Sequence, residues 1–150
     1  MNQSKIKTVL VGAGYFGQKR IKACLDLKDD LSIVGIVDSD QKKIKTIEKN
    51  YSLQVFSKLS DIKEKFNLAI ISTPNNTHAD LAVEALSLGA NVLCEKPLAS
   101  NSKEALKIVK AANKHNLLVK TGSNHRFFSS VQKAFELYKN GEIGELLSFR

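Results

Sequence analysis

The sequence has only two cysteines, Cys24 and Cys94, among its 150 residues. They are too few and too far apart for a disulfide framework or a metal site, so we expect two reduced, buried thiols. No apolar run approaches the roughly 20 residues needed to cross a bilayer. The stretch Met1–Lys5 leads directly into a predicted strand and contains no signal-peptide apolar region. These absences predict a cytoplasmic protein without a metal site or a membrane partner.

Arginine is also scarce, with only Arg20, Arg126 and Arg150, although the net charge is +8. A basic surface can neutralise nucleic-acid phosphates, but Arg is the residue favoured for bidentate phosphate and base contacts. The lysines are scattered along the chain. We therefore expect a solvated basic surface with some attraction for anionic ligands, and no nucleic-acid partner.

The most informative stretch is Thr8–Gly17, an apolar run that ends in G-x-G-x-x-G at Gly12, Gly14 and Gly17. These glycines permit a tight turn, approach of a pyrophosphate to the backbone, and close helix–strand packing. The N-terminus of the following helix would face the phosphates. Asp38 ends the next apolar run, about 20 residues after Gly17, where a carboxylate would accept hydrogen bonds from an adenosine ribose. The combination predicts a dinucleotide-binding site.

Strand and helix patterns alternate over most of the chain, which predicts an α/β fold with a doubly wound parallel (Rossmann) sheet. Predicted strands cover residues 8–11, 33–37, 53–56, 67–72, 91–94 and 117–121. Predicted helices cover residues 18–27, residues 40–50 with Asp40 as cap, and residues 101–116. Another helix is predicted to be capped by Asn76 or Thr77 and to end at Gly89, and a short helical turn is predicted to start at Ser60 or Asp61. In the helix over 101–116, the residues expected to face inward are Ala105, Ile108, Val109 and Ala112.

The alternation changes after residue 122. A turn-rich link leads to a helix with Val131, Ala134, Phe135 and Tyr138 on one face, and Leu146–Phe149 is predicted to begin a further strand. We therefore divide the chain into a dinucleotide-binding domain, residues 1–123, and the start of a second α/β domain, residues 124–150. A strand so close to the last residue suggests that the natural protein continues.

Ligands of open α/β sheets bind beyond the carboxyl ends of the strands. Residues 12–17, Asp38, residues 73–78 and residues 95–97 should meet there. Lys96 could hydrogen-bond a substrate hydroxyl and stabilise a developing alkoxide, or it could be a solvated charge.

Three other polar residues have two interpretations each. His78 could pack against its helix or act as an acid or base. Asn75 could bind a cofactor or stabilise its own turn. Arg126 could pair with an anionic ligand or tie the link to the sheet.

Five segments together resemble one family: Val11–Gly17, Ser72–His78, Cys94–Pro97, Gly122–Phe127 and Gly141–Glu145. They are similar to the glucose–fructose oxidoreductase, inositol dehydrogenase and rhizopine-catabolism (Gfo/Idh/MocA) oxidoreductases. The resemblance covers nearly the whole chain and several ordered motifs.

The resemblance implies an NAD-dependent oxidoreductase that transfers a hydride at a hydroxyl carbon of a sugar, polyol or nucleotide-linked sugar. It implies that Lys96 is the catalytic lysine. Residues implied to lie along the cofactor are Gly12, Gly14, Tyr15, Phe16, Gly17, Asp38, Thr73, Pro74, Asn75, His78, Glu95, Lys96, Asn124 and Arg126, the last two near the nicotinamide.

Members of this family carry a second, larger domain that supplies the substrate pocket, an Asp/His pair and most of the oligomer interface. The resemblance therefore implies a homo-oligomer for the full-length protein and no turnover by the 150-residue chain alone. Neither His115 nor His125 aligns with the catalytic histidine, so no general base is assigned.

Two alternatives remain open. A non-catalytic sensor could keep the dinucleotide site, although it would have no need of Lys96; a methyltransferase could bind S-adenosylmethionine through the glycine loop, although Glu95–Pro97 argues against it. We expect NAD rather than NADP, because Asp38 would repel a 2′-phosphate, an effect that Lys42 and Lys43 could soften.

Overall fold

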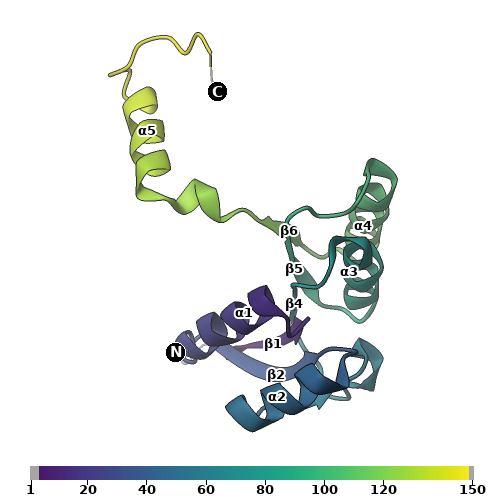
Figure 1. Cartoon of the computed structure of the whole chain (residues 1–150). Coiled ribbons are helices and arrows are strands. Elements are labelled where there is room, and N and C mark those ends of the chain that lie inside the picture. The colour runs from purple at the N-terminus through teal and green to yellow at the C-terminus, as the bar shows by residue number, and fades with distance from the viewer. Residues whose placement is uncertain (1–3, 149–150) are drawn as a thin grey trace.

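The computed structural model describes residues 4–148, which form a six-stranded parallel sheet followed by a projecting helix (Figure 1). The strand order is β3-β2-β1-β4-β5-β6, and every adjacent pair is parallel. The strands are β1 (Ile6–Val11), β2 (Leu31–Val37), β3 (Val55–Phe56), β4 (Leu68–Ile71), β5 (Asn91–Glu95) and β6 (Val119–Gly122). This order is that of the Rossmann fold and confirms the predicted doubly wound sheet.

Helices cover both faces of the sheet, with α1 and α2 on one face and α3 and α4 on the other (Figure 1). The helices are α1 (Tyr15–Asp26), α2 (Gln41–Tyr51), α3 (His78–Ser87), α4 (Ser102–His115) and α5 (Ser129–Lys139). Short 3₁₀ turns are η1 (Leu59–Asp61), η2 (Asn75–Thr77) and η3 (Asn124–Phe127).

The two faces have separate cores because successive strand residues point to opposite sides of a sheet. In β1, Val9 and Val11 pack with α3 and α4, whereas Leu10 packs on the other face with Ile21 of α1 and Ile47 of α2. Strands buried on both faces read as continuous apolar runs, which is why the alternation of apolar runs and helices predicted this architecture.

Two predicted helix caps are present. The Asp40 carboxylate accepts a hydrogen bond from the Lys42 N–H at 2.9 Å, and the Asn101 side chain accepts one from the Glu104 N–H at 3.0 Å. Gly89 follows α3 with φ +87°, a conformation that favours glycine. The predicted side-chain cap of α3 is wrong. Thr77 stands at the cap position, but its hydroxyl donates to the Pro74 carbonyl oxygen and lies 2.7 Å from the Thr73 hydroxyl, because η2 runs directly into the helix.

Two further predictions are corrected. Helix α1 begins at Tyr15 rather than Gln18, so Tyr15, Phe16 and Gly17 form its first turn. Val109 does not face inward: its side chain is 46% exposed, because the buried stripe of α4 is narrower and consists of Ile108 and Ala112.

The last segment differs most from prediction. Figure 1 shows α5 projecting away from the sheet beyond η3, and Val131, Phe135 and Tyr138 on its predicted apolar face are exposed. The predicted strand at Leu146–Phe149 is wrong over residues 146–148, which have no regular structure, and Phe149 lies outside the described residues. A strand forms only against a partner strand, and Leu147 is 88% exposed.

The topology changes direction between β1 and β4, which are neighbours in the sheet although β2 and β3 separate them in sequence. Ligands of such sheets bind at this switch point, beyond the carboxyl ends of the strands. No helix in residues 4–148 is long and apolar enough to cross a membrane.

Candidate functional site

The glycine loop after β1 has the geometry predicted from its spacing. Gly12 has φ +97°, and a Cβ there would lie 2.8 Å from the Ser72 carbonyl oxygen. A Cβ on Gly17 would lie 1.9 Å from the Gly12 carbonyl oxygen, so α1 packs directly on the loop. A Cβ on Gly14 would meet nothing within 4 Å. Two glycines therefore allow close backbone packing, and Gly14 faces open space.

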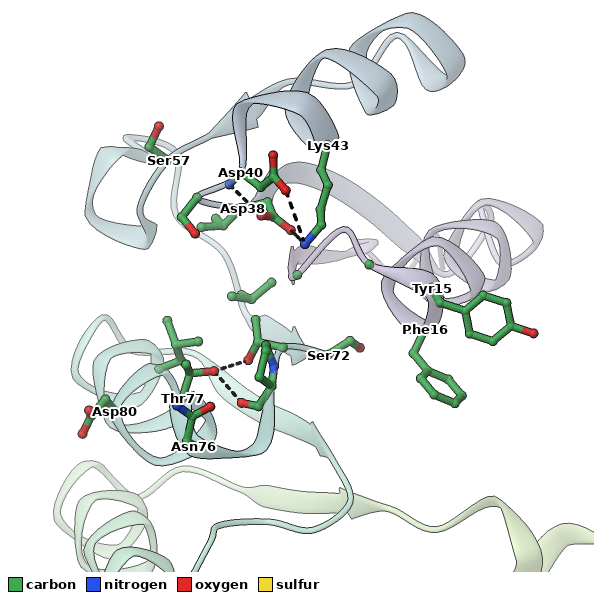
Figure 2. A pocket seen from close by; sticks show the side chains of 18 residues that line it. Tyr15, Phe16, Asp38, Asp40, Lys43, Ser57, Ser72, Asn76, Thr77 and Asp80 are labelled. Atoms are coloured by element: carbon green, nitrogen blue, oxygen red, sulfur yellow. Dashed lines mark hydrogen bonds and ion pairs between the residues drawn. The ribbon is translucent and has the colours of Figure 1, made fainter.

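That open space lies at the N-terminus of α1, where the first N–H groups have no partner within the helix. No acidic side chain occupies the first turn of α1. The positive end of the helix dipole is therefore available to an anion. Figure 2 shows the rings of Tyr15 and Phe16 projecting from this turn, and Lys19 lies 4.5 Å from the centre of the Tyr15 ring.

Asp38 connects the end of β2 to the glycine loop. Its Oδ2 accepts a hydrogen bond from the Ala13 N–H at 2.7 Å, and its Oδ1 accepts one from the Asp40 N–H at 2.9 Å. The Lys43 ammonium lies 3.9 Å from Asp38 Oδ2 and 3.9 Å from an oxygen of Asp40 (Figure 2). Each carboxylate oxygen of Asp38 keeps a second lone pair, so the side chain is fixed in place and can still accept further hydrogen bonds.

The segment after β4 forms the wall opposite Asp38. The Thr77 hydroxyl lies 2.7 Å from Thr73 Oγ1 and 2.7 Å from the Pro74 carbonyl oxygen (Figure 2). Ser72 Oγ is buried and has no hydrogen-bond partner within residues 4–148. A buried hydroxyl without a partner is costly, so this atom is a position where a ligand group would complete a hydrogen bond.

His78 has a structural role in the same segment. Its side chain is fully buried, with Nδ1 2.7 Å from the Pro97 carbonyl oxygen and Nε2 2.9 Å from the Thr73 carbonyl oxygen. Carbonyl oxygens only accept, so a neutral ring donates to one of them and a protonated ring to both. His78 thus ties the turn after β4 to the segment after β5, which favours the packing interpretation over an acid or base role.

A cleft of about 690 Å³ runs between these walls (Figure 2). The glycine loop and first turn of α1, the segment Val37–Asp40 with Lys43, Ser57 after β3, and residues of the Ser72–Leu81 segment line it. The volume is typical of small-molecule sites. The cleft combines an anion-binding helix end with a carboxylate at one side.

A second cleft of about 480 Å³ adjoins the first, since Phe16, Ser72 and Thr73 line both. It contains Lys96, which is exposed at the end of β5, together with Arg20, Glu95, Asn124 and His125. Arg20 donates to Glu95 Oε1 from Nε at 2.8 Å and also from Nη2. The charged groups of the second cleft are therefore the cations Arg20 and Lys96 and one carboxylate, Glu95, which is already paired with Arg20.

The two cysteines lie outside this chemistry. Burial, and then the charge of Glu95, raise the pKa of the Cys94 thiol to about 12. Burial also raises the pKa of Cys24, against a smaller opposite effect of Arg20. Both thiols are buried and stay protonated at neutral pH, so neither is a nucleophile. No group of three or more potential metal ligands occurs in the described part of the chain.

The structure gathers most of the predicted site residues. The first cleft is lined by Gly12, Gly14, Tyr15, Phe16, Asp38, Thr73 and Pro74, and the second by Phe16, Thr73, Asn75, His78, Glu95, Lys96 and Asn124. Gly17 and Arg126 line neither: Gly17 packs on the loop, and Arg126 lies in η3 next to His125. Contact of these residues with a cofactor stays a prediction.

Several residues that line the clefts were not predicted as site residues, and four of them bear on the chemistry. Ser57 follows β3 directly, so the rule that ligands bind at the carboxyl ends of strands points to it. Arg20 lies one helical turn after Gly17, but nothing in the sequence indicates that it pairs with Glu95. Ser72 and His125 lie within the segments Ser72–His78 and Gly122–Phe127, in which only other residues were predicted to have site roles.

A dinucleotide fits this arrangement on three observations. Open space lies over Gly14 at an uncompensated helix N-terminus, the fixed carboxylate of Asp38 stands at one end, and the unpartnered Ser72 hydroxyl lies between the two clefts.

Comparison with known proteins agrees with this geometry. Residues 6–123 match the family model for the "Oxidoreductase family, NAD-binding Rossmann fold", Gfo/Idh/MocA. Glucose-6-phosphate 3-dehydrogenase of Bacillus subtilis is 28% identical over 144 residues, which is 96% of this chain and 41% of that protein. Inositol 2-dehydrogenase of Corynebacterium glutamicum is 28% identical over 149 residues, 97% of this chain and 44% of that protein.

Among solved structures, the WlbA dehydrogenase of Bordetella pertussis, in complex with NADH and UDP-GlcNAcA, superposes with a TM-score of 0.89 at 25% identity. The match covers 94% of this chain and 44% of that chain. The chain thus spans about two fifths of the length of the relatives it matches.

Proposed function

Since this chain belongs to the Gfo/Idh/MocA oxidoreductase family, with its NAD-binding Rossmann fold, we propose that its two clefts hold one nicotinamide dinucleotide. We propose further that the protein transfers a hydride between this cofactor and a hydroxyl carbon of a sugar, polyol or nucleotide-linked sugar. The named relatives, which act on glucose 6-phosphate and inositol, support that substrate class.

One observation carries the proposal: the N-terminal end of α1, the fixed Asp38 carboxylate and Lys96 line two clefts that share a wall. The N–H groups of the first turn of α1 would bind the diphosphate. Asp38 would accept hydrogen bonds from the adenosine ribose with its free lone pairs. A bound nicotinamide in the second cleft would supply the hydride acceptor or donor.

Lys96 is the group we assign to the chemical step. Its side chain is exposed into the second cleft at the end of β5. An ammonium there would hydrogen-bond the substrate hydroxyl and stabilise the negative charge that develops on its oxygen as hydride leaves. A protein that only sensed the dinucleotide would not need such a group.

We propose NAD rather than NADP as the cofactor. The Asp38 carboxylate is fixed by two backbone N–H groups, so it would need to break hydrogen bonds to turn away from a 2′-phosphate. Lys43 offsets part of this repulsion from 3.9 Å. Asp38 is 9% exposed, whereas the Lys43 side chain is 46% exposed. Water therefore screens the charge of Lys43 more strongly, and the negative charge of Asp38 dominates the interaction with a 2′-phosphate.

We also propose different roles for two parts of the chain. Residues 1–123 would bind the cofactor, and residues 124–150 would begin a second domain that completes the substrate pocket, supplies the partner acid and base groups, and forms a homo-oligomer interface. The 150-residue chain would then bind NAD without oxidising sugars at a useful rate.

Titration of the chain with NAD, NADP and S-adenosylmethionine, followed by thermal unfolding and calorimetry, tests the proposal. We expect NAD to bind most tightly. The Asp38→Ala variant should lose about 1–3 kcal/mol of NAD binding, the usual value of hydrogen bonds to a charged group. Asp26→Ala, an exposed change at the far end of α1, is the matched control and should bind NAD normally.

The outcomes separate the parts of the proposal. If neither dinucleotide binds, the proposed function is wrong. Equal affinities for NAD and NADP would contradict the cofactor preference alone, and selective binding of S-adenosylmethionine would replace the oxidoreductase with a methyltransferase.

A further inference from the structure

Arg20 and Glu95 form an ion pair in the lining of the second cleft, which also contains Lys96. Arg20 comes from α1, and Glu95 is the last residue of β5, 75 positions later in the sequence. Two guanidinium nitrogens donate to Glu95 Oε1. The side chains are 36% and 17% exposed, so the pair is partly shielded from water.

The second carboxylate oxygen of Glu95 points to the neighbouring strand. Glu95 pairs in register with Gly122 of β6, and Oε2 lies 3.5 Å from the position that a Cβ on Gly122 would take. The carboxylate is thus held between α1 and β6, away from the residue that follows it. Within residues 4–148, no ion pair joins Lys96 to a carboxylate.

Without Arg20, Glu95 would carry an uncompensated negative charge next to Lys96, and its side chain is only 17% exposed to water. Such a charge would attract the Lys96 ammonium and would also act on any ligand in the second cleft. The proposed function places the nicotinamide there, and its ring is positively charged when oxidised and uncharged when reduced. An unpaired carboxylate would therefore favour the oxidised cofactor.

We propose that Arg20 is a positioning residue that holds and neutralises Glu95, and that it thereby sets the relative affinity for oxidised and reduced cofactor and leaves Lys96 unpaired. This inference rests on the proposed function, because it requires the nicotinamide to enter the second cleft. Arg20 acts through Glu95 and need not touch the substrate.

A purely structural tie between α1 and β5 predicts something different. Losing it would lower stability and weaken both cofactor forms equally, since they share the adenosine and diphosphate groups. The ratio of the two dissociation constants therefore distinguishes the roles, and it can be measured with this chain without a substrate.

The experiment compares the dissociation constants of NAD⁺ and NADH for the wild type and five variants at low ionic strength. Arg20→Met should raise the ratio Kd(NADH)/Kd(NAD⁺) by roughly threefold to tenfold, as expected for one unit charge acting across several ångströms in a partly hydrated site. Glu95→Gln should shift the ratio in the opposite direction. The double variant, which is neutral again, should return it close to the wild-type value.

Two controls complete the design. Arg20→Lys keeps the charge while losing the bidentate geometry, so it should retain most of the wild-type ratio. Lys7→Met removes the cation of a different ion pair, Lys7–Glu64, which also joins segments far apart in the sequence but lines neither cleft. This variant should leave the ratio unchanged.

If Arg20→Met weakens NAD⁺ and NADH by the same factor, the proposal is overturned and the pair is structural. If Arg20→Met does not fold, Glu95→Gln alone tests the proposal, because it should lower the ratio Kd(NADH)/Kd(NAD⁺). An unchanged ratio in Glu95→Gln overturns the proposal. Absence of binding of either form by the wild type would instead refute the proposed function.

Discussion

Two glycines of the same loop should respond in different ways to the same added methyl group. In Gly17→Ala, the new Cβ would lie 1.9 Å from the carbonyl oxygen and 2.8 Å from the carbonyl carbon of Gly12. Both are backbone atoms, so the clash can be relieved only if α1 moves away from the loop. In Gly14→Ala, the new Cβ would meet nothing within 4 Å, and the backbone angles of Gly14 suit any residue.

The size of each effect follows from these distances. Overpacking that forces backbone shifts typically costs about 1–3 kcal/mol, and the contact at Gly17 is severe. Alanine recovers up to about 1 kcal/mol of helix propensity there. We expect a net loss of about 2 kcal/mol, or roughly 4–8 °C in melting temperature for a chain of this size. Alanine is a poorer N-cap than glycine, so Gly14→Ala should cost up to about 1 kcal/mol, which is less than the loss expected for Gly17→Ala.

Cofactor binding should be weaker in both variants, for different reasons. The methyl group of Gly14→Ala would occupy the space over the N-terminus of α1, where the diphosphate is proposed to lie. We expect at least a tenfold loss of NAD affinity in a protein that melts closer to the wild type than Gly17→Ala does. Gly17→Ala should lower both the melting temperature and the affinity, because the helix end itself is displaced.

Thermal unfolding and NAD titration of both variants check these expectations. Wild-type affinity in Gly14→Ala would refute the proposed diphosphate position. A wild-type melting temperature in Gly17→Ala would refute the inference that the loop and α1 are packed without spare room.

Three further predictions concern other parts of the molecule. In a protein that includes the substrate-binding domain, Lys96→Met should cut turnover on the order of a hundredfold while NAD affinity stays nearly unchanged. The reason is that the Lys96 ammonium acts on charge that develops during the reaction. Near-normal turnover would contradict this role. Burial raises the pKa of the Cys94 thiol from its ordinary value of 9.0 to about 12, so its stabilising contribution is fully present below pH 9 and is lost as the pH rises from 9 towards 12. Urea unfolding at pH 8 and pH 10 should therefore show that the stability advantage of the wild type over Cys94→Ala narrows at the higher pH. An equal advantage at both pH values would contradict the shift. Asn101→Ala removes the side chain that accepts a hydrogen bond from the Glu104 N–H at the start of α4, and should lower the free energy of unfolding by about 1 kcal/mol without changing NAD affinity. An unchanged unfolding midpoint would show that the cap does not contribute to stability.

The sequence alone determined the parts of the fold that depend on short-range patterns. Apolar runs with glycine or polar ends predicted the strands, and side-chain caps at Asp40 and Asn101 marked where helices begin. The rule that ligands bind at the carboxyl ends of parallel strands then predicted that the glycine loop, Asp38 and Lys96 would meet at one edge. These inferences held because each depends on residues a few positions apart, or on a topology that short connections impose.

The same patterns failed where stability depends on a partner. Leu146–Phe149 has a strand-like composition, yet residues 146–148 are not a strand, because no strand within residues 4–148 lies beside them to offer hydrogen bonds. The apolar face of α5 was predicted correctly as a face, but the pattern could not tell that it lies exposed. Composition indicates what a segment can bury, and only its neighbours decide whether it does.

Only the tertiary structure decided which polar groups pair at the site. The bond between the Ala13 N–H and Asp38, the contacts of His78 with Thr73 and Pro97, and the pairing of Arg20 with Glu95 all join segments that strands or helices separate. Each depends on the register of neighbouring strands and on the rotation of a helix over the sheet, which no local periodicity encodes. The sequence thus placed the chemistry at one edge of the sheet, and the packing of the two layers of helices fixed which charges remain free there.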